Sequence, residues 1–234
     1  MTEFRPGSFQ MIPPVIKNLL IINVLVFLAQ QAMGANEIKM LNLFALHDLH
    51  SVYFRPHQLV TYLFLHGGWD HIFFNMFALW MFGAILENYW GGKRFLIFYV
   101  VSGVGAAVCH LAVLYPEMSA EIARLQQQYT PEAIQEALYS PGYPINEATL
   151  GASGAVFGCL AAFGYLFPNN LIYLYFFVPI KAKWMVLGYA AIELFSGIRS
   201  SAGDNVAHWA HLGGGLVGLL LVIWWNRTNR RNFY

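Results

Sequence analysis

One serine in this sequence stands where it could act as a nucleophile. Ser153 lies in the small-residue run Gly151-Ala152-Ser153-Gly154, which opens an apolar segment that ends at Pro168. A glycine-flanked serine at a helix start has two interpretations. Small residues let a neighbouring helix pack closely, and they also leave a hydroxyl accessible to a substrate. The choice between packing and catalysis depends on the partners that the rest of the chain supplies.

A serine hydroxyl is a poor nucleophile until a base takes its proton, and a later apolar segment carries two histidines that could do so. His208 and His211 lie near the start of the segment 206–225. A polar helix mouth that packs or binds a lipid headgroup is one interpretation. Ionisable groups inside a membrane are costly, however, and usually mark function. We therefore assign His211 as the base and expect His208, nearer to the surface, to be structural.

Two pairs of glycines indicate how this serine and this histidine could meet. Gly154 and Gly158 lie four residues apart on one segment, and Gly214 and Gly218 lie four apart on the other. Such faces of small residues let two helix backbones approach closely. We therefore expect the two segments to bring the serine within hydrogen-bond reach of the histidine.

A third segment could stabilise the oxyanion of an acyl-transfer intermediate. His71 and Asn75 belong to the run HGGWDHIFFN at 66–75 and lie four residues apart, on one face of a helix. Both side chains can donate hydrogen bonds. So can the backbone N–H of the serine at a helix N-terminus, where the helix dipole also favours negative charge. His66 precedes the helix and is expected to brace the external loop.

The sequence places no carboxylate where it would orient His211 as the acid of a triad. Glu87 lies at the inner end of its segment, Asp204 in an external loop, and Glu193 at an unknown angle. The sequence therefore predicts a Ser–His dyad that attacks an amide carbonyl. The predicted site comprises Ser153 and His211 as catalytic residues, His71, Asn75, Gly151 and Gly154 around the oxyanion, and His66, Gly214 and Gly218 in support.

The same histidines admit a metal-dependent alternative. HxxxxH at 66–71 and HxxH at 208–211 resemble the histidine boxes of membrane di-iron oxygenases and desaturases. Those enzymes need more histidines, typically with an adjacent His-His pair, which this sequence lacks. We predict no metal and no cofactor.

The composition places these segments in a membrane. The chain has 234 residues, of which 58% are hydrophobic and only 11% charged, and its mean hydropathy is +0.49. Soluble domains carry about 25% charged residues. The net charge of +1, without a basic patch, predicts no nucleic-acid partner. Cys109 and Cys159 lie in apolar runs and are expected to be packing residues.

Six apolar segments predict an all-α polytopic membrane bundle over residues 15–226. Their approximate ranges are 15–33, 71–89, 94–115, 151–167, 184–198 and 206–225. The first could be mistaken for a signal peptide, but we expect an uncleaved span. Between them we expect a partly helical interfacial loop at 34–65, an external insertion at 116–148 with two short helices, and an aromatic interfacial segment at 169–180.

Six spans put the tails 1–14 and 227–234 on one side of the membrane. Nine lysines and arginines then share that side: Arg5, Lys17, Lys93, Arg94, Lys181, Lys183, Arg227, Arg230 and Arg231. Four lie opposite: Lys39, Arg55, Arg124 and Arg199. The positive-inside tendency therefore predicts cytoplasmic termini, and it puts Ser153 near the outer surface.

In combination, three motifs closely resemble the rhomboid intramembrane serine proteases. They are HGGWDHIFFN at 66–75, GASGAVFG at 151–158 and AHLGGGLVG at 210–218, and the resemblance covers about residues 15–226. It implies a six-helix core that cuts transmembrane segments of single-span or other membrane proteins in the bilayer, often at small residues. It also implies Ser153 as nucleophile, His211 as base, His71 and Asn75 at the oxyanion, and the fifth span as a lateral gate.

The sequence departs from the family pattern at two places. Many rhomboids carry Trp-Arg where this chain has His57-Gln58, so the anchoring of the first external loop is open. The insertion 116–148 is longer than in minimal bacterial members; we expect it to be a tolerated surface loop rather than a substrate-binding element.

A proteolytically inactive, client-binding relative is the alternative function, although such relatives usually lack one of the two catalytic residues. A compact chain without a transit peptide favours a bacterial inner membrane.

Overall fold

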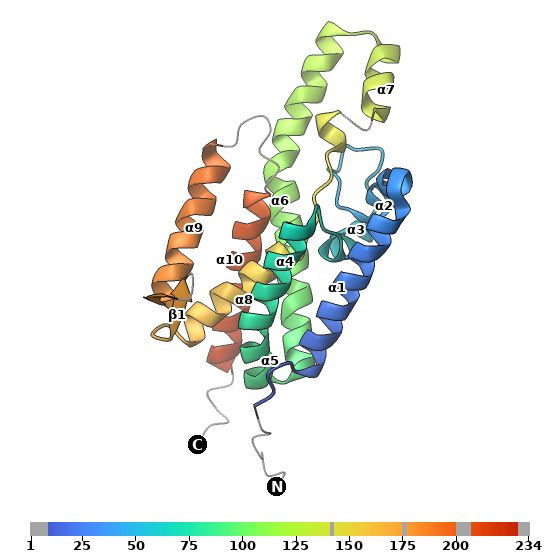
Figure 1. Ribbon diagram of the computed structural model, residues 1–234. Coiled ribbons are helices and arrows are strands. Elements are labelled where there is room, and N and C mark those ends of the chain that lie inside the picture. Colours follow the sequence, from blue (N-terminus) through green and yellow to red (C-terminus); the bar gives the residue numbers. More distant parts are fainter. Residues whose placement is uncertain (1–8, 141–142, 175–176, 200–206, 229–234) are drawn as a thin grey trace.

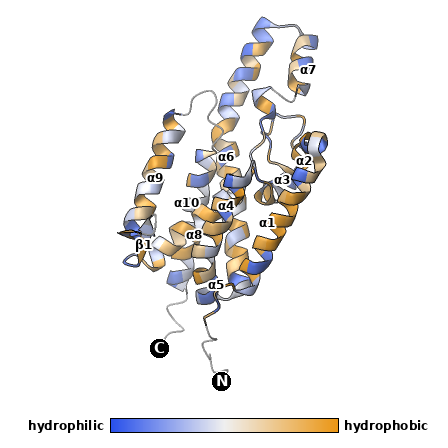
Figure 2. Ribbon diagram, viewed as in Figure 1, coloured by the Kyte–Doolittle hydropathy of each residue, from blue (hydrophilic) through white to orange (hydrophobic). Residues whose placement is uncertain are grey.

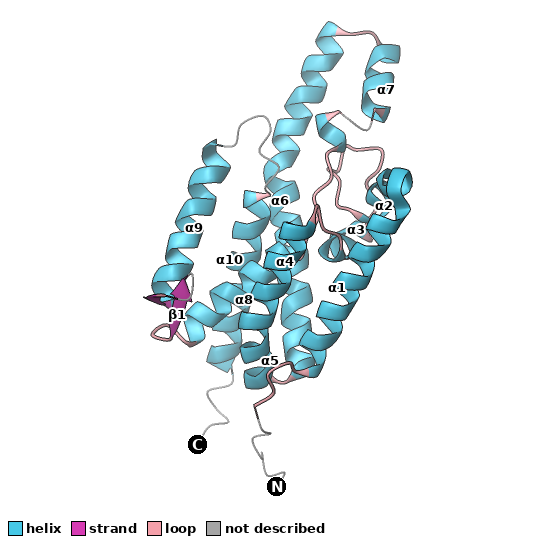
Figure 3. Ribbon diagram, in the orientation of Figure 1, coloured by secondary structure: helices cyan, strands magenta, loops and turns pink. Residues whose placement is uncertain are grey.

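The computed structural model describes residues 9–140, 143–174, 177–199 and 207–228, and long helices dominate it (Figures 1 and 3). The bundle helices are α1 (Pro14–Met33), α4 (Trp69–Ala78), α5 (Ala84–Trp90), α6 (Gly92–Gln128), α8 (Ser153–Leu166), α9 (Ala182–Arg199) and α10 (His208–Thr228). A π-helical turn, η3 (Leu79–Gly83), joins α4 and α5 into one rod. The first residue of α1 and the last of α10 lie at the same end of the bundle, opposite α7 (Pro131–Tyr139).

Within the part of the chain that the structure describes, four stretches are long and apolar enough to cross a membrane: 14–44, 69–90, 92–128 and 208–228. The apolar α8 is shorter, and α9 has eighteen residues. Hydrophobic residues dominate these helices, whereas the far part of α6 and α7 carry hydrophilic ones (Figure 2). Many large apolar side chains face outward, among them Phe73, Phe74, Ile192 and Trp224. The protein is therefore an all-α polytopic membrane protein, with lipid as the solvent of its outer face.

Short elements cover one end of the bundle. The connection expected at 34–65 contains η1 (Gly34–Asn36), α2 (Glu37–Phe44), α3 (Gln58–Thr61) and η2 (Tyr62–Phe64), and η4 (Pro144–Asn146) follows α7. The partly helical prediction for that connection is confirmed.

The segment after α8 forms a hairpin of β1 (Leu171–Leu174) and β2 (Val178–Lys181), in which Ile172 pairs with Ile180. The aromatic segment is thus too short to form another span.

The insertion differs from the prediction of two separate short helices. The first of them is the continuation of α6, which runs through Pro116 to Gln128. Proline removes one backbone donor from the ladder, but the following residues are mostly strong helix formers, so the helix continues. The predicted break at Thr130-Pro131 is present, and the Thr130 hydroxyl caps α7 by accepting a hydrogen bond from Ala133 N–H.

Several sequence predictions fall outside the described residues. They concern residues 1–8 and 229–234 of the two tails, the start of the last span at Val206, and the loop that contains Asp204.

Helix α8 is the centre of the bundle. Ten of its fourteen residues are buried, and it packs against α6 and α10. A Cβ on Gly158 would lie 2.6 Å from Ser102 Cβ on α6, and one on Gly218 would lie 2.7 Å from Gly158 Cα. A Cβ on Gly214 would overlap the Gly154 carbonyl. The close glycine-to-glycine packing expected from the sequence is therefore confirmed.

Candidate active site

The site begins where the chain turns into α8. Gly151 has φ +126°, a conformation that side-chain-bearing residues rarely adopt, and its N–H donates to the Tyr62 carbonyl at 2.9 Å. Tyr62 is itself fixed, because its hydroxyl donates to the Gly103 carbonyl on α6 at 2.8 Å. This turn delivers Ser153 as the first residue of α8. The amides of a first helical turn have no intrahelical acceptor, so they remain available to an anion.

Ser153 and His211 meet between α8 and α10. His211 Nε2 lies 2.8 Å from Ser153 Oγ, a hydrogen-bond distance between residues 58 positions apart in sequence. The His211 ring stacks on Phe157 with a centroid distance of 4.4 Å and an interplanar angle of 8°. Phe157 lies one turn after the serine on the same helix face, a spacing that could have marked it in the sequence. One helix thus carries the hydroxyl and also the surface that orients the imidazole.

His71 is oriented by a backbone donor. Gly67 N–H donates to His71 Nδ1 at 3.2 Å, so this nitrogen is the acceptor and the proton of the neutral ring sits on Nε2. A Cβ on Gly151 would lie 2.8 Å from His71 Nε2 and 3.6 Å from Ser153 Oγ. The Nε2–H group is therefore directed to the region beside the serine, where only glycine leaves room for the ring.

Asn75 lies one turn further along α4 and is buried. Its Nδ2 donates to the His71 carbonyl at 2.9 Å, which uses one of its two N–H groups on its own helix. A second N–H remains on the same amide.

His66 lies under this helix start rather than in the reaction region. Its backbone is tied to α1, because its N–H donates to Gln30 Oε1 at 3.0 Å and its carbonyl accepts from Gln30 Nε2 at 3.2 Å. Its ring packs edge-on against His71 at 5.1 Å. Burial, together with nearby His71, lowers the pKa of His66 to about 4, so the ring is neutral at pH 7. These contacts suit the bracing position expected of it.

A carboxylate that the sequence left unplaced lies beside His211. Glu193 of α9 is 8% exposed, and its Oε2 lies 2.6 Å from His208 Nδ1 and 3.0 Å from His211 Nδ1. The prediction that no carboxylate lies where it could orient His211 is therefore wrong. The angle of α9 about its axis depends on packing that the sequence does not reveal, although an acid inside an apolar helix was a signal in itself.

Among the described residues, one group could hold a metal, and it consists of Glu193, His208 and His211. One donor atom from each of Glu193, His208 and His211 lies within 4.8 Å of the others. Two histidines and a carboxylate suit Zn²⁺. Here, however, the atoms pair with one another and His211 faces the serine. His66 and His71, which form the other histidine box of the metal-dependent alternative, are not part of this group.

The connection between α1 and α4 has an anchor of its own. Gln58, which stands where many rhomboids carry arginine, is fully buried. Its Nε2 donates to the carbonyls of Asn42 and Tyr53 at 3.1 and 2.9 Å. Its Oε1 accepts from the backbone amides of His47 and Arg55 at 3.3 and 3.1 Å. One neutral amide thus ties the loop together at the position whose anchoring the sequence left open.

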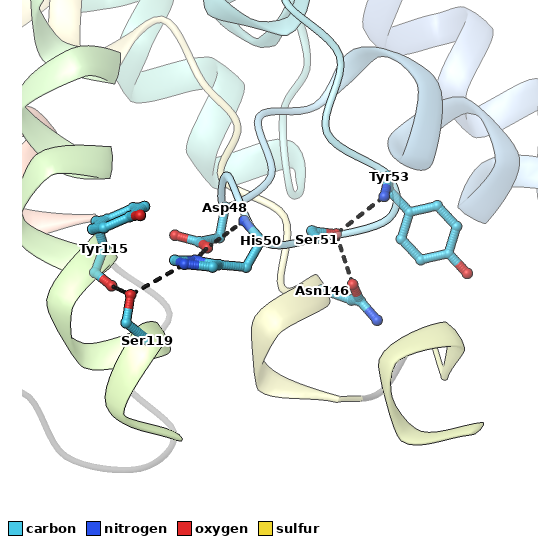
Figure 4. A network of polar contacts seen from close by, with 7 residues as sticks. All are labelled: Asp48, His50, Ser51, Tyr53, Tyr115, Ser119 and Asn146. Carbon is cyan, nitrogen blue, oxygen red and sulfur yellow. Dashed lines mark hydrogen bonds and ion pairs between the residues drawn. The ribbon is translucent and has the colours of Figure 1, made fainter. Parts of the chain in front are cut away.

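The insertion packs on this loop through polar contacts (Figure 4). Ser51 Oγ donates to Asn146 Oδ1 at 2.6 Å, and His50 Nε2 lies 3.1 Å from Ser119 Oγ on the continuation of α6. Asp48 Oδ1 lies 2.7 Å from the other ring nitrogen of His50. The backbone of Leu46 pairs with Thr149, two residues before the Gly151 turn. Of these contacts, only that between His50 and Ser119 involves residues 119–140, so the expectation of a tolerated surface loop stays a prediction.

The fold and the site define a polytopic membrane protein with a partly buried Ser–His pair between two of its helices. A family model described as the Rhomboid domain matches residues 53–227, most of the chain. The chain therefore belongs to the rhomboid family.

Three relatives illustrate the range of the family. The chain is 28% identical to Rhomboid-like protein 11, chloroplastic, of Arabidopsis thaliana, over 87% of this chain and 62% of the relative. It is 31% identical to Rhomboid protein 1, mitochondrial, of Saccharomyces cerevisiae, over 70% and 40%. It is 30% identical to Rhomboid protease GluP of Bacillus subtilis, over 69% and 24%. The chain thus spans less than two thirds of the length of each.

Proposed function

We propose that the protein is an intramembrane serine endopeptidase that cuts transmembrane segments of other membrane proteins. The observation that carries the proposal is the 2.8 Å contact between His211 Nε2 and Ser153 Oγ, made at the start of an apolar helix. A serine next to a histidine is the arrangement that acyl transfer requires. Relatives named as proteases, such as Rhomboid protease GluP, support the same activity.

In the proposed reaction Ser153 Oγ forms a bond to the scissile carbonyl carbon while its proton passes to His211 Nε2. The C–N bond then breaks as His211 returns that proton to the leaving amine. Water attacks the resulting ester, again with His211 as base, and releases the new carboxyl terminus. The stacked Phe157 keeps the imidazole in one orientation through these steps.

Negative charge on the carbonyl oxygen is proposed to be stabilised by His71, Asn75 and the Ser153 backbone N–H. The Nε2–H of His71, oriented by Gly67, is supported as a donor by its closeness to Gly151. Asn75 would contribute the N–H that its helix does not use. Donors held in place before the reaction lose little free energy to reorganisation, which is why such sites are effective.

The substrate is proposed to be a single-span or other transmembrane protein that reaches the site laterally from the bilayer. Helix α9 lies at the edge of the bundle and packs on α8 and α10, with many of its apolar side chains exposed. Its displacement would open a path to Ser153. A backbone made accessible by helix-destabilising residues in the substrate would then fit beside Gly151.

The six spans, the cytoplasmic termini and the outward-facing site belong to the same proposal. The lysine and arginine distribution supports this orientation. A bacterial inner membrane is proposed as the location; the printed names of the relatives include chloroplastic and mitochondrial proteins as well as bacterial ones.

The alternative is an inactive protein that binds membrane clients through the same surfaces. Co-expression with a panel of tagged single-span proteins separates the two functions. We expect at least one panel member to be cleaved by the wild type and to remain intact with Ser153→Ala at equal expression. Cleavage by Ser153→Ala would contradict the serine mechanism, and a wild type that only co-purifies with uncut partners would favour the alternative.

A further inference from the structure

Glu193 is a buried acid that the proposed dyad does not use. It is the one acidic residue in α9, and its carboxylate is turned to α10 rather than to lipid. A buried carboxylate is costly unless it is paired. Here Oε2 contacts two imidazole nitrogens, Nδ1 of His208 at 2.6 Å and Nδ1 of His211 at 3.0 Å.

The close packing of α9 on α10 places the Glu193 carboxylate beside His208 and His211. Gly197 lies one turn after Glu193, and a Cβ there would lie 3.3 Å from His208 Cβ and 3.2 Å from Trp209 Cε2. A side chain at this position would therefore make a tight contact with α10. The glycine thus allows the short distance between the carboxylate and the histidines.

From this geometry we infer that Glu193, held by His208, is a positioning residue for His211 and completes a Ser153–His211–Glu193 array. The inference rests on the proposed function. A carboxylate at Nδ1 favours the tautomer that leaves the Nε2 lone pair facing the serine hydroxyl. It also stabilises the imidazolium that forms when the serine proton is transferred, without taking that proton itself.

The two contacts of Glu193 differ in alignment. That to His208 is an aligned hydrogen bond, whereas His211 Nδ1 is close to Oε2 but makes no aligned hydrogen bond among the described residues. Catalytic hydrogen bonds are often poorly aligned in unliganded structures and tighten when substrate binds. His208 holds the acid in place and His211 uses it, which gives the HxxH spacing a role that needs no metal.

The inference also links catalysis to substrate entry. Glu193 lies on α9, the helix whose movement is proposed to admit substrate. When α9 moves outward, the carboxylate leaves His211, and the serine loses its activated base. Full activity then requires that α9 return over the bound segment.

The test compares Ser153 reactivity in Glu193→Gln and wild type, both as full-length protein in detergent. Fluorophosphonate–rhodamine is the probe, and the rate constant of inactivation, kinact, is separated from the probe's binding constant, KI. Glutamine keeps the shape and loses the charge. We expect kinact to fall about 10- to 100-fold, with KI unchanged. This loss is smaller than that seen when the acid of a Ser–His–Asp triad is replaced, because Phe157 also holds the His211 ring. Glu193→Asp should recover part of the loss.

Glu87→Gln is the matched control, because Glu87 is a buried acid at the opposite end of the bundle. It caps α1 by accepting from the amides of Val15 and Ile16 at 2.9 and 2.8 Å. This control should lower the melting temperature and leave kinact unchanged.

A Glu193→Gln protein that labels at the wild-type rate overturns the inference, as does a Glu193→Asp rate no higher than that of Glu193→Gln. If Glu193→Gln does not fold, proton NMR of the wild type carrying the covalent phosphonyl adduct decides, because the adduct occupies the site as a substrate would. A downfield His211 Nδ1–H resonance, absent in His211→Ala, supports the inference, and its absence contradicts it. Wild-type protein that never labels at Ser153 would instead contradict the proposed function.

Discussion

Ser153→Ala and His211→Ala should each lower kcat for a cleaved reporter by about 10³-fold or more, and the double variant should be no worse than either alone. In the proposed mechanism the two side chains act as one unit, because the serine loses its proton across the 2.8 Å contact. Without the base the hydroxyl is inert, and without the hydroxyl the base has no proton to take. KM should change little, since neither group is proposed to bind the body of the substrate.

The measurement is cleavage of a panel-selected reporter by purified protein in detergent. Ser102→Ala is the matched control, because Ser102 is another buried serine in the bundle and lies on α6 against Gly158. It should keep wild-type kcat. Losses that multiply in the double variant would mean that serine and histidine act independently, contrary to the proposed mechanism.

Gly214→Ala should be among the most destabilising single-methyl changes in the chain. The added Cβ would overlap the backbone carbonyl of Gly154, which cannot rotate away as a side chain can. Overpacking of this kind typically costs about 1–3 kcal/mol, and occasionally more. Because Gly214 lies one turn after His211, and Gly154 lies next to Ser153, separation of the helices should also pull the catalytic pair apart. A lower melting temperature and a lower fraction of labelled Ser153 are expected together.

Gly215→Ala is the adjacent control for this substitution. A Cβ on Gly215 would meet nothing closer than the Phe157 carbonyl at 3.9 Å, an ordinary contact. The two variants add the same methyl group to the same helix, one position apart. Equal melting temperatures would show that the glycine contact between α8 and α10 does not hold the site together.

Much of the site could be predicted because its positions follow from local spacing. The glycines four residues apart on α8 and α10 indicated the close approach, and the i, i+4 pair His71 and Asn75 indicated a shared face. The span boundaries within the described residues differ from the helix ends by at most three residues, apart from the extension of α6. There, good helix formers carry the helix past Pro116 into water.

Contacts that depend on how elements distant in sequence pack together could not be predicted from the sequence. Glu193 contacts His211 because α9 turns one face to α10, and an apolar, lipid-exposed helix carries little amphipathic pattern to reveal that face. Gln58 anchors its loop through backbone groups from three separate stretches, so its type alone predicted nothing. In both cases the tertiary arrangement decides the role of the residue.

The most direct measurement of the central claim is the site of covalent labelling. Full-length protein in detergent is treated with a fluorophosphonate, digested and mapped by mass spectrometry. The proposed chemistry predicts one adduct, on Ser153, that is lost in His211→Ala and after heat denaturation. A folded wild type that carries no adduct, or an adduct on another serine, would contradict the assignment of Ser153 as the nucleophile.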